Sequence, residues 1–266
     1  LGDPRQQVGY AATFGAGLRV GLGAGLSLAG SVQQTLTQNL DRGAPSDSLL
    51  PHVRSDYARY AREGRDIAIP QLYAQGVWTL APDLFARVTA GYLEPMFAGA
   101  SAEMLWRPRD RPFAIGAEIA QVAQRAYDQR FGLLPYRVTT GHVSLYADLP
   151  WWNLYAVLRG GRYLAGDWGG TIEIGRRFDS GIEVGAFATF TNVAYSRYGE
   201  GSFDKGIYLR VPLDLFGVQS RSVATALVRP VQRDGGQRLA PDYSLWDLTR
   251  EGREDGFRRG IGGVLR

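Results

Sequence analysis

The chain has 266 residues, no cysteine, two histidines and a formal net charge of +4. Without cysteine there is no disulfide framework, thiol nucleophile or cysteine-ligated metal site, and His52 and His142 are too far apart in sequence to form a metal-binding motif. The basic residues are Lys205 and 29 interspersed arginines, so nucleic acid is not an expected partner. No segment approaches the run of about 20 apolar residues that a membrane-spanning helix requires. We expect no metal and no cofactor.

Short stretches that alternate apolar with small or polar residues run from about residue 7 to residue 230. Residues 18–28 are the clearest example: the even positions from Leu18 to Leu28 are all apolar, whereas the odd positions carry Arg19, three glycines and Ser27. Alternate side chains of a strand point to opposite faces, so one face is apolar and the other is polar or lined by glycine. This pattern is typical of an outer-membrane β-barrel, with lipid outside and water inside.

Turn residues divide this region into thirteen candidate strands. Their approximate ranges are 7–15, 18–33, 50–62, 66–80, 84–93, 98–107, 113–124, 137–148, 153–163, 169–178, 182–193, 204–214 and 220–229. Bacterial single-chain barrels have an even number of strands, and 50–62 alternates least, so it is the first candidate for removal. The predicted fold is an all-β, antiparallel transmembrane β-barrel of about 12 strands (range about 10–14).

The connections between the predicted strands suggest an orientation. Short connections at 81–83, 107–112, 149–152, 179–181 and 215–217 fall at alternate joints, so they share one rim, which we assign to the periplasm. Longer loops, 125–136 and 194–203, lie at the opposite joints. By the same parity the segment 34–49 would lie on the periplasmic side. An aromatic girdle is expected at the short-turn rim, formed by Trp78, Trp106, Trp151, Trp152, Phe178 and Phe216.

The alternation stops after about residue 230, so we divide the chain into a barrel, 1–232, and a partly irregular C-terminal tail, 233–266. Ser244 followed three residues later by Asp247 resembles a helix-capping start, which predicts a short helix near 244–250. Pro212 cannot donate to a ladder and marks a bulge or a strand end.

If the apolar set faces lipid, the opposite set lines the lumen. Charges against lipid cost about 2–4 kcal/mol for an arginine at the midplane, so their placement on one face is informative. Two interpretations remain open: a filled interior of arginine–carboxylate pairs, or a wet lumen whose guanidinium groups and rings hold a hydroxyl-rich or acidic polymer. The predicted lumen-lining residues are Arg87, Glu103, Arg107, Glu118, Tyr155, Arg159, Glu173, Arg177, Glu183, Tyr208 and Arg210.

An enzyme is the weaker alternative. Four inward carboxylates (Glu103, Glu118, Glu173 and Glu183) invite a glycosidase interpretation, but pairing with arginine would make them poor general acids. His142 and Ser144 share a face, as acyl hydrolysis by a lipid A deacylase could use. Neither pattern identifies a catalytic residue, so no enzymatic activity is predicted.

Several segments, taken in order and spacing, resemble the C-terminal part of the YjbH/GfcD family of exopolysaccharide and capsule biosynthesis proteins. The resemblance covers about residues 70–250 and is carried by residues 91–99, 139–142, 161–167, 176–181, 187–193, 199–208 and 233–236. It implies an outer-membrane β-barrel, often a lipoprotein, that acts in exporting or assembling an extracellular polysaccharide. Family members are longer and carry an N-terminal lipid-anchored cysteine. We therefore expect this chain to be a mature C-terminal piece, whose absent N-terminal portion would carry the targeting segment and form a second barrel.

The sequence thus predicts a bacterial outer-membrane barrel that serves exopolysaccharide or capsule secretion as a passive conduit or docking platform. The expected partners are the polysaccharide, outer-membrane lipid, periplasmic polysaccharide-secretion proteins and the absent N-terminal portion. Three alternatives stay open: a closed scaffolding barrel for periplasmic machinery, a barrel hydrolase, and a soluble β-sandwich.

Overall fold

The computed structural model describes residues 9–43, 45–46, 48–194, 203–212, 223–228, 233–241 and 243–250, with the backbone alone for 223–228 and Arg250. Its strands are β1 (Ala11–Gly23), β2 (Leu26–Gln38), β3 (Ala68–Ala81), β4 (Leu84–Tyr92), β5 (Phe97–Trp106), β6 (Phe113–Arg125), β7 (Leu133–Asp148), β8 (Leu154–Arg162), β9 (Trp168–Arg177), β10 (Glu183–Thr191), β11 (Asp204–Pro212) and β12 (Val223–Val228). The helices are η1 (Leu40–Arg42), α1 (Tyr57–Glu63) and α2 (Leu245–Arg250).

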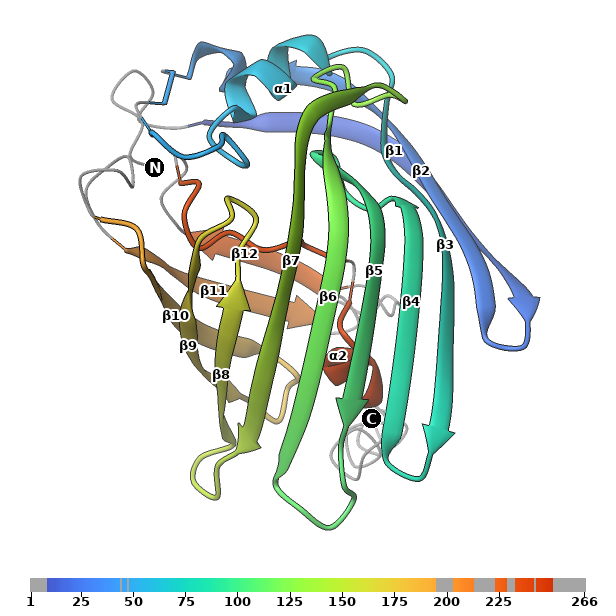
Figure 1. Ribbon diagram of the computed structural model, residues 1–266, viewed down its shortest axis with the longest axis vertical. Coiled ribbons are helices and arrows are strands. Elements are labelled where there is room, and N and C mark those ends of the chain that lie inside the picture. The colour runs from blue at the N-terminus through green and yellow to red at the C-terminus, as the bar shows by residue number, and fades with distance from the viewer. Residues whose placement is uncertain are drawn as a thin grey trace.

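The strands form one antiparallel sheet in which each strand pairs with its neighbours in the chain, in the order β1 to β12. The sheet curls around an interior that contains the chain leading to α2 (Figure 1). The all-β antiparallel prediction is therefore confirmed. Closure of the ring is not: within the described residues, β1 and β12 are the two edges of the strand order. No helix in the described part of the chain has the length and hydropathy required to cross a bilayer.

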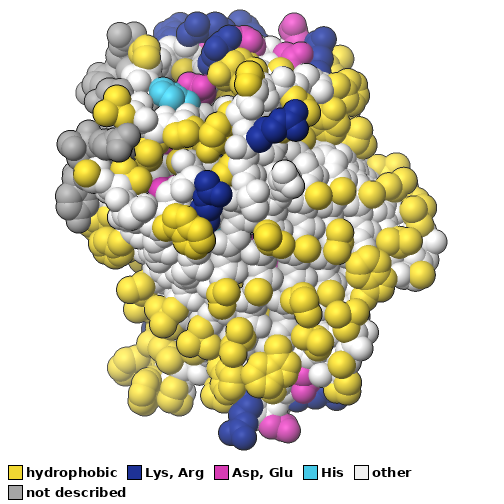
Figure 2. All heavy atoms as spheres, in the orientation of Figure 1, with side chains coloured by type: hydrophobic (Ala, Val, Ile, Leu, Met, Phe, Trp, Pro, Cys, Tyr) yellow, Lys and Arg dark blue, Asp and Glu magenta, His cyan; other side chains and the backbone are white. Residues whose placement is uncertain are grey.

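The two faces of the sheet differ in chemistry. Outward residues on successive strands are large, apolar and exposed, as at Leu28, Val88, Ile119, Leu158 and Ile172. Figure 2 shows one side of this outer face, where hydrophobic side chains are spread over the strands and most charged side chains lie toward the two ends. The inner face holds charged and aromatic side chains that are buried or half-buried. An apolar set turned inward with arginines outside, the arrangement of a soluble sandwich, is not what this sheet shows.

The first hairpin corrects the predicted strands 7–15 and 18–33. The reversal lies at Ala24 and Gly25, whose φ angles of 50° and 80° fit the two-residue hairpin turn that requires positive φ at both positions. Such a turn places Gly23 opposite Leu26, and a bulge at Gly21/Gly23 then brings Val20 opposite Leu28. Even-numbered residues therefore face outward on both strands. The alternation of the sequence continues through the turn, so it does not reveal where the turn lies.

The predicted strand 50–62 is wrong, because this segment is irregular up to α1. Within α1, Arg59 and Glu63 form an i,i+4 ion pair at 2.7 Å, and the buried Tyr60 donates its hydroxyl to the carbonyl of Arg125 at 2.6 Å. With one strand fewer, each connection that precedes residue 50 moves to the opposite end of the sheet. The connection 39–67 therefore lies at the end of the sheet with the loops 93–96 and 126–132, which we call the cap end. The prediction that 34–49 shares a rim with the short turns is wrong, because these turns lie at the opposite end.

The opposite end, here the turn end, carries the connections 24–25, 82–83, 107–112, 149–153 and 178–182. The prediction that short connections share one rim is confirmed for these residues, whereas 215–217 lies outside the described part. Trp78, Trp106, Trp151, Trp152 and Phe178 are exposed around this end, and Phe216 also lies outside the described residues. Pro212 is the last described residue of β11 and pairs with Val223 of β12, and the residues that follow it lie outside the described part, so the predicted bulge or strand end stays a prediction.

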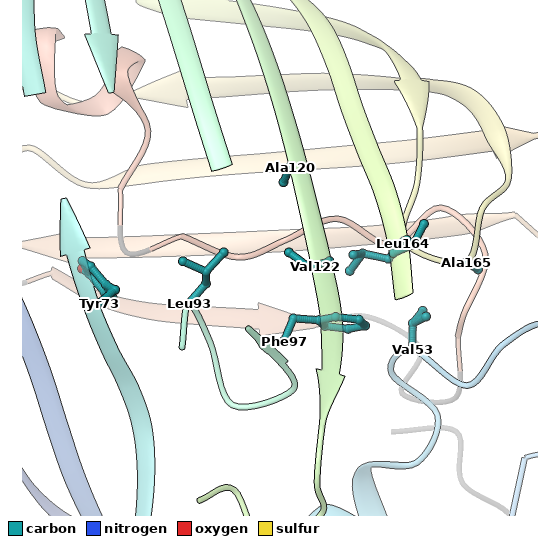
Figure 3. Close-up of a cluster of buried hydrophobic side chains, with 9 residues drawn as sticks. Val53, Tyr73, Leu93, Phe97, Ala120, Val122, Leu164 and Ala165 are labelled. Atoms are coloured by element: carbon teal, nitrogen blue, oxygen red, sulfur yellow. The ribbon is translucent and has the colours of Figure 1, made fainter. Parts of the chain in front are cut away.

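Apolar side chains fill part of the interior near the cap end. Val53 from the cap segment (residues 48–65) packs with Phe97 and Val122 of the sheet and with Leu164 of the β8–β9 turn, and all four are buried (Figure 3). A second cluster around Leu105, Tyr146 and Tyr155 encloses Leu245 and Trp246 of α2. The interior is thus a packed core built partly by elements that are not strands.

Candidate functional site: the charged interior and its C-terminal segment

The predicted lumen-lining side chains all lie on the inner side of the sheet. Arg87, Glu103, Arg107, Glu183 and the two tyrosines are buried, and the other five are half-buried. They do not face open solvent, because a segment formed by residues 233–241 and 243–250, which we call the inner segment, runs through the interior from the cap end to the turn end. The filled-interior interpretation therefore describes this structure better than the wet lumen.

Near the cap end, Asp234 fixes the inner segment to the cap segment. Its carboxylate accepts hydrogen bonds from the backbone N–H groups of Arg54 and Ser55 at 2.9 and 3.0 Å, and from the Ser55 hydroxyl at 2.7 Å. Arg54 in turn pairs with the buried Glu94 through both guanidinium Nη atoms, and donates to the carbonyl of Arg238 at 2.7 Å. These bonds connect the cap segment, the β4–β5 turn and the inner segment as one unit.

The β8–β9 turn binds the inner segment beside this unit. Asp167 accepts from the N–H of Gly236 at 2.8 Å, and the N–H of Leu164 donates to the carbonyl of Gln237 at 2.8 Å. Burial raises the pKa of Asp167 above its ordinary value, although the hydrogen bond from Gly236 opposes this effect. Ionisation of this carboxyl therefore works against the docked arrangement.

Midway along the interior, Glu118 joins the wall to the inner segment. Its Oε1 lies 3.0 Å from Nδ1 of His142 and 3.2 Å from an Nη atom of Arg238. Arginine keeps its charge in proteins, because its guanidinium does not deprotonate at physiological pH. Arg238 is therefore a cation in the interior, and Glu118 is the carboxylate that pairs with it.

Arg87 and Glu103 face each other across β4 and β5 and form a buried ion pair of 2.6 Å. Both also bind the inner segment: Arg87 donates to the carbonyl of Tyr243, and Glu103 accepts from the N–H of Leu245 at 3.0 Å. Arg107 holds the next turn of the segment, because its guanidinium donates to the carbonyl of Trp246 at 3.2 Å. Three of the predicted lumen-lining residues thus bind the chain's own inner segment.

On the opposite wall, Glu183 lies between Arg177 at 3.3 Å and Arg210 at 3.5 Å, and Arg210 approaches Asp247 of α2 at 3.8 Å. Tyr155 and Tyr208 share a hydrogen bond, and Tyr208 donates to Glu173 at 2.6 Å. These charges are thus paired with one another within the wall, which satisfies polar groups that are buried inside the sheet.

The sequence reasoning missed several residues of this network. Arg125 is fully buried, and its guanidinium donates to the carbonyls of Ile69, Pro70, Glu94, Gln129 and Arg130 at 2.6–3.0 Å. No strand pattern marks it, because its partners are backbone atoms. The contacts of Arg238, Tyr243 and Trp246 were missed because alternation ends before them, although the Ser244–Asp247 pattern predicted the helix. The Ser244 hydroxyl accepts from the N–H of Asp247 at 3.1 Å, as that pattern requires.

Among the described residues, a cavity lies beside the inner segment. An internal cavity of about 50 Å³ lies between the sheet and residues 239–241 and is lined by Arg87, Glu103, Glu118 and His142 among others. At about 10–15 Å³ per water, it holds about four water molecules. This cavity is therefore too small for a sugar ring while the inner segment stays in place.

The side chains of the two predicted catalytic patterns are, among the described residues, bound to other partners. The Ser144 hydroxyl accepts from Nε of Arg159 at 3.2 Å, and His142 is held by Glu118. Glu103 and Glu118 are cross-strand partners, but each is bound to a cation. Among the described residues, no group of three or more His, Cys, Asp or Glu side chains is placed to hold a metal ion.

Comparison with known proteins identifies relatives of the chain. The model of the YjbH family, described as exopolysaccharide biosynthesis protein YbjH, matches residues 1–251. The chain is 41% identical over 231 residues to a protein of Escherichia coli (strain K12) named "Uncharacterized lipoprotein YjbH". That match covers 84% of this chain and 33% of the relative, so the chain spans about a third of the curated relative's length. No solved structure matches the chain.

Proposed function

This chain belongs to the YjbH family of exopolysaccharide biosynthesis proteins, and on that premise we propose that it is an outer-membrane barrel for exopolysaccharide secretion, closed at rest by its own inner segment. The observation that carries the proposal is the combination of an exposed apolar outer face with a charged, internally paired inner face. The relative of E. coli is named a lipoprotein, which agrees with a location in the cell envelope.

The dimensions of the sheet support membrane insertion. A tilted strand crosses the hydrocarbon layer with about 9–11 residues, and β8, β9 and β10 have 9, 10 and 9 residues. Exposed aromatic side chains gather at the turn end, where Trp151 and Trp152 are 63% and 75% exposed. Aromatic residues prefer the membrane–water interface. Twelve strands in meander order place β1 antiparallel to β12, so pairing of these two edges would close the barrel.

The contacts of the inner segment support a gated conduit. Its polar bonds to the wall are made by guanidinium and carboxylate groups, which can exchange these bonds for bonds to the hydroxyl or acidic groups of a polysaccharide. Once the segment is displaced, the same side chains would offer weak, exchangeable contacts to a sugar chain. Synthesis or partner proteins would supply the movement.

Conductance of the purified chain in planar bilayers tests this proposal. We expect closed wild-type barrels, and polymer-blockable currents when Glu103→Gln and Glu118→Gln are combined to loosen the inner segment. In cells, replacing Arg87, Arg107, Arg159, Arg177 and Arg210 by glutamine in pairs should reduce export while the barrel still folds. The matched control is the exposed pair Arg65→Gln and Arg176→Gln. Normal export from every inner pair would contradict a conduit.

A closed scaffold is the second candidate, and the filled interior favours it. A scaffold would hold periplasmic polysaccharide proteins at the membrane without passing the polymer. It predicts silence in bilayers from both the wild type and the Glu103→Gln/Glu118→Gln variant. It also predicts that export depends on surface residues of the two ends rather than on the inner arginines.

A further inference from the structure

A shallow groove of about 400 Å³ lies on the outer face across β7–β10. Gly160 and Gly170 are cross-strand partners and form its floor, because neither carries a side chain. Val143 flanks Gly160 on β7, and Phe190 flanks Gly170 on β10. Leu145, Leu158 and Ile172 line the side toward the turn end, so the groove is bounded by apolar groups.

The cap-side edge of the groove has a different chemistry. Two residues beyond the glycine pair, Arg162 and Trp168 are the next outward cross-strand partners. Trp168 is 59% exposed. Arg137 lies on the same face of β7, four residues beyond Gly141, the partner of Arg162, and its side chain is exposed. Since residues rise about 3.3 Å along a strand, Arg162 is about 7 Å from the groove floor.

The charge around the groove is of one sign. On the described outward positions of β7–β10 the charged side chains are Arg137, Arg162 and Arg176, and none is acidic. Arginine near the membrane surface attracts anionic lipid by about 1 kcal/mol per residue. Tryptophan settles at the headgroup level. An apolar groove below an arginine and a tryptophan is therefore complementary to an acyl chain whose headgroup is anionic.

We propose that this groove is a binding site for an anionic phospholipid, with an acyl chain over Gly160 and Gly170 and the phosphate at Arg162. The inference rests on the proposed membrane insertion and adds a specific lipid to it. The missing side chains let the acyl chain lie closer to the backbone than elsewhere on the apolar wall. Trp168 packs beside the upper part of the chain, and Arg137 adds to the positive potential above it.

Single substitutions on the outer face can fill the groove or remove its positive charge without changing the interior. A Cβ built on Gly160 would meet only the carbonyl of Gly169, at 3.9 Å, so Gly160→Leu should fold and occupy the groove. Its matched control is Ala90→Leu, an exposed outward position on β4. Arg162→Gln removes the charge, and Arg176→Gln, an outward arginine at the other end of β9, is its control.

The experiment is native mass spectrometry of the full chain in neutral detergent, titrated with phosphatidylglycerol or phosphatidylcholine, with vesicle flotation beside it. We expect phosphatidylglycerol to bind with the higher affinity, weakened about fivefold by Arg162→Gln and about tenfold by Gly160→Leu, whereas both controls keep wild-type affinity. Equal binding of the two lipids, or binding unchanged by Gly160→Leu, would overturn the site while flotation still showed insertion. Dimers abolished by Gly160→Leu would assign the groove to a second copy instead. Failure to float with vesicles would overturn the membrane proposal itself.

Discussion

Removing the charge of Glu118 should loosen the inner segment. Its carboxylate holds Nδ1 of His142 at 3.0 Å and Arg238 at 3.2 Å, and Arg238 is a cation inside the sheet. Contacting residues in such networks show coupling energies of about 0.5–3 kcal/mol. For Glu118→Gln we take about 1.4 kcal/mol, a tenfold increase in the population in which the segment is displaced.

The lack of cysteine in the chain provides the assay. Leu245 is 0% exposed, so the thiol of a Leu245→Cys variant reacts with a maleimide reagent only when the inner segment moves. In this background, Glu118→Gln should raise the labelling rate about tenfold, and Arg238→Gln should raise it similarly. In the double variant, the change in the free energy of displacing the inner segment should be smaller than the sum of the changes in the two single variants, because each single change removes the same interaction.

The matched control is Glu63→Gln, which removes the exposed partner of Arg59 on α1 and should leave the labelling rate unchanged. Two results would refute the reasoning. Equal labelling of the wild-type and Glu118→Gln backgrounds would show that the pair does not hold the segment. Fast labelling of the wild-type background would show that the interior is not closed in solution.

Three further changes test other parts of the network. Arg125→Met removes the donor that five backbone carbonyls share and should lower the free energy of unfolding by about 3 kcal/mol or more. Urea titration measures this change against the exposed Arg130→Met, which should change the free energy of unfolding by less than about 0.5 kcal/mol. The pKa of Asp167 is raised, so its stabilising contribution is complete below the ordinary value and is lost as the pH rises through the raised one; Asp167→Asn should flatten the rise in thiol labelling between acidic and neutral pH, and an unchanged profile would exclude Asp167 as its source. Ser244→Ala removes the cap of α2 and should cost about 1 kcal/mol, visible as labelling increased about fivefold.

Alternation predicted which side chains lie on each face because it depends only on the two-residue period of a strand. The inner placement of Glu103 and Arg107 follows from it directly. Alternation did not predict how the first 60 residues divide into strands. The bulge at Gly21/Gly23 keeps even-numbered residues on the outer face through the turn, so the turn leaves no break in the pattern. The helical segment 57–63 was read as a strand because its apolar residues are too few to establish a helical period.

The candidate site was predictable in its wall but not in its occupant. Tertiary contacts decide what fills the interior. The inner segment has no periodic pattern of apolar residues from which its position could be predicted. The arginines expected to meet a polymer instead meet backbone carbonyls, as Arg87 meets Tyr243 and Arg107 meets Trp246. A carbonyl oxygen and a sugar hydroxyl oxygen are both neutral acceptors, so the residue types alone do not distinguish the two partners.

The likeness between carbonyl and hydroxyl acceptors also underlies the proposed role of the interior. Each polar wall contact of the inner segment has an aqueous substitute, and net contributions of single hydrogen bonds are only about 0.5–1.5 kcal/mol. The apolar contacts of Leu245 and Trp246 have no such substitute, because leaving the interior would expose both side chains to water. In the proposed conduit, a polymer would therefore compete for the charged groups of the wall, whereas the packing of α2 would set the free energy required to displace the inner segment. If export depends on displacement, replacing Trp246 by alanine should open the barrel more effectively than removing any single charge.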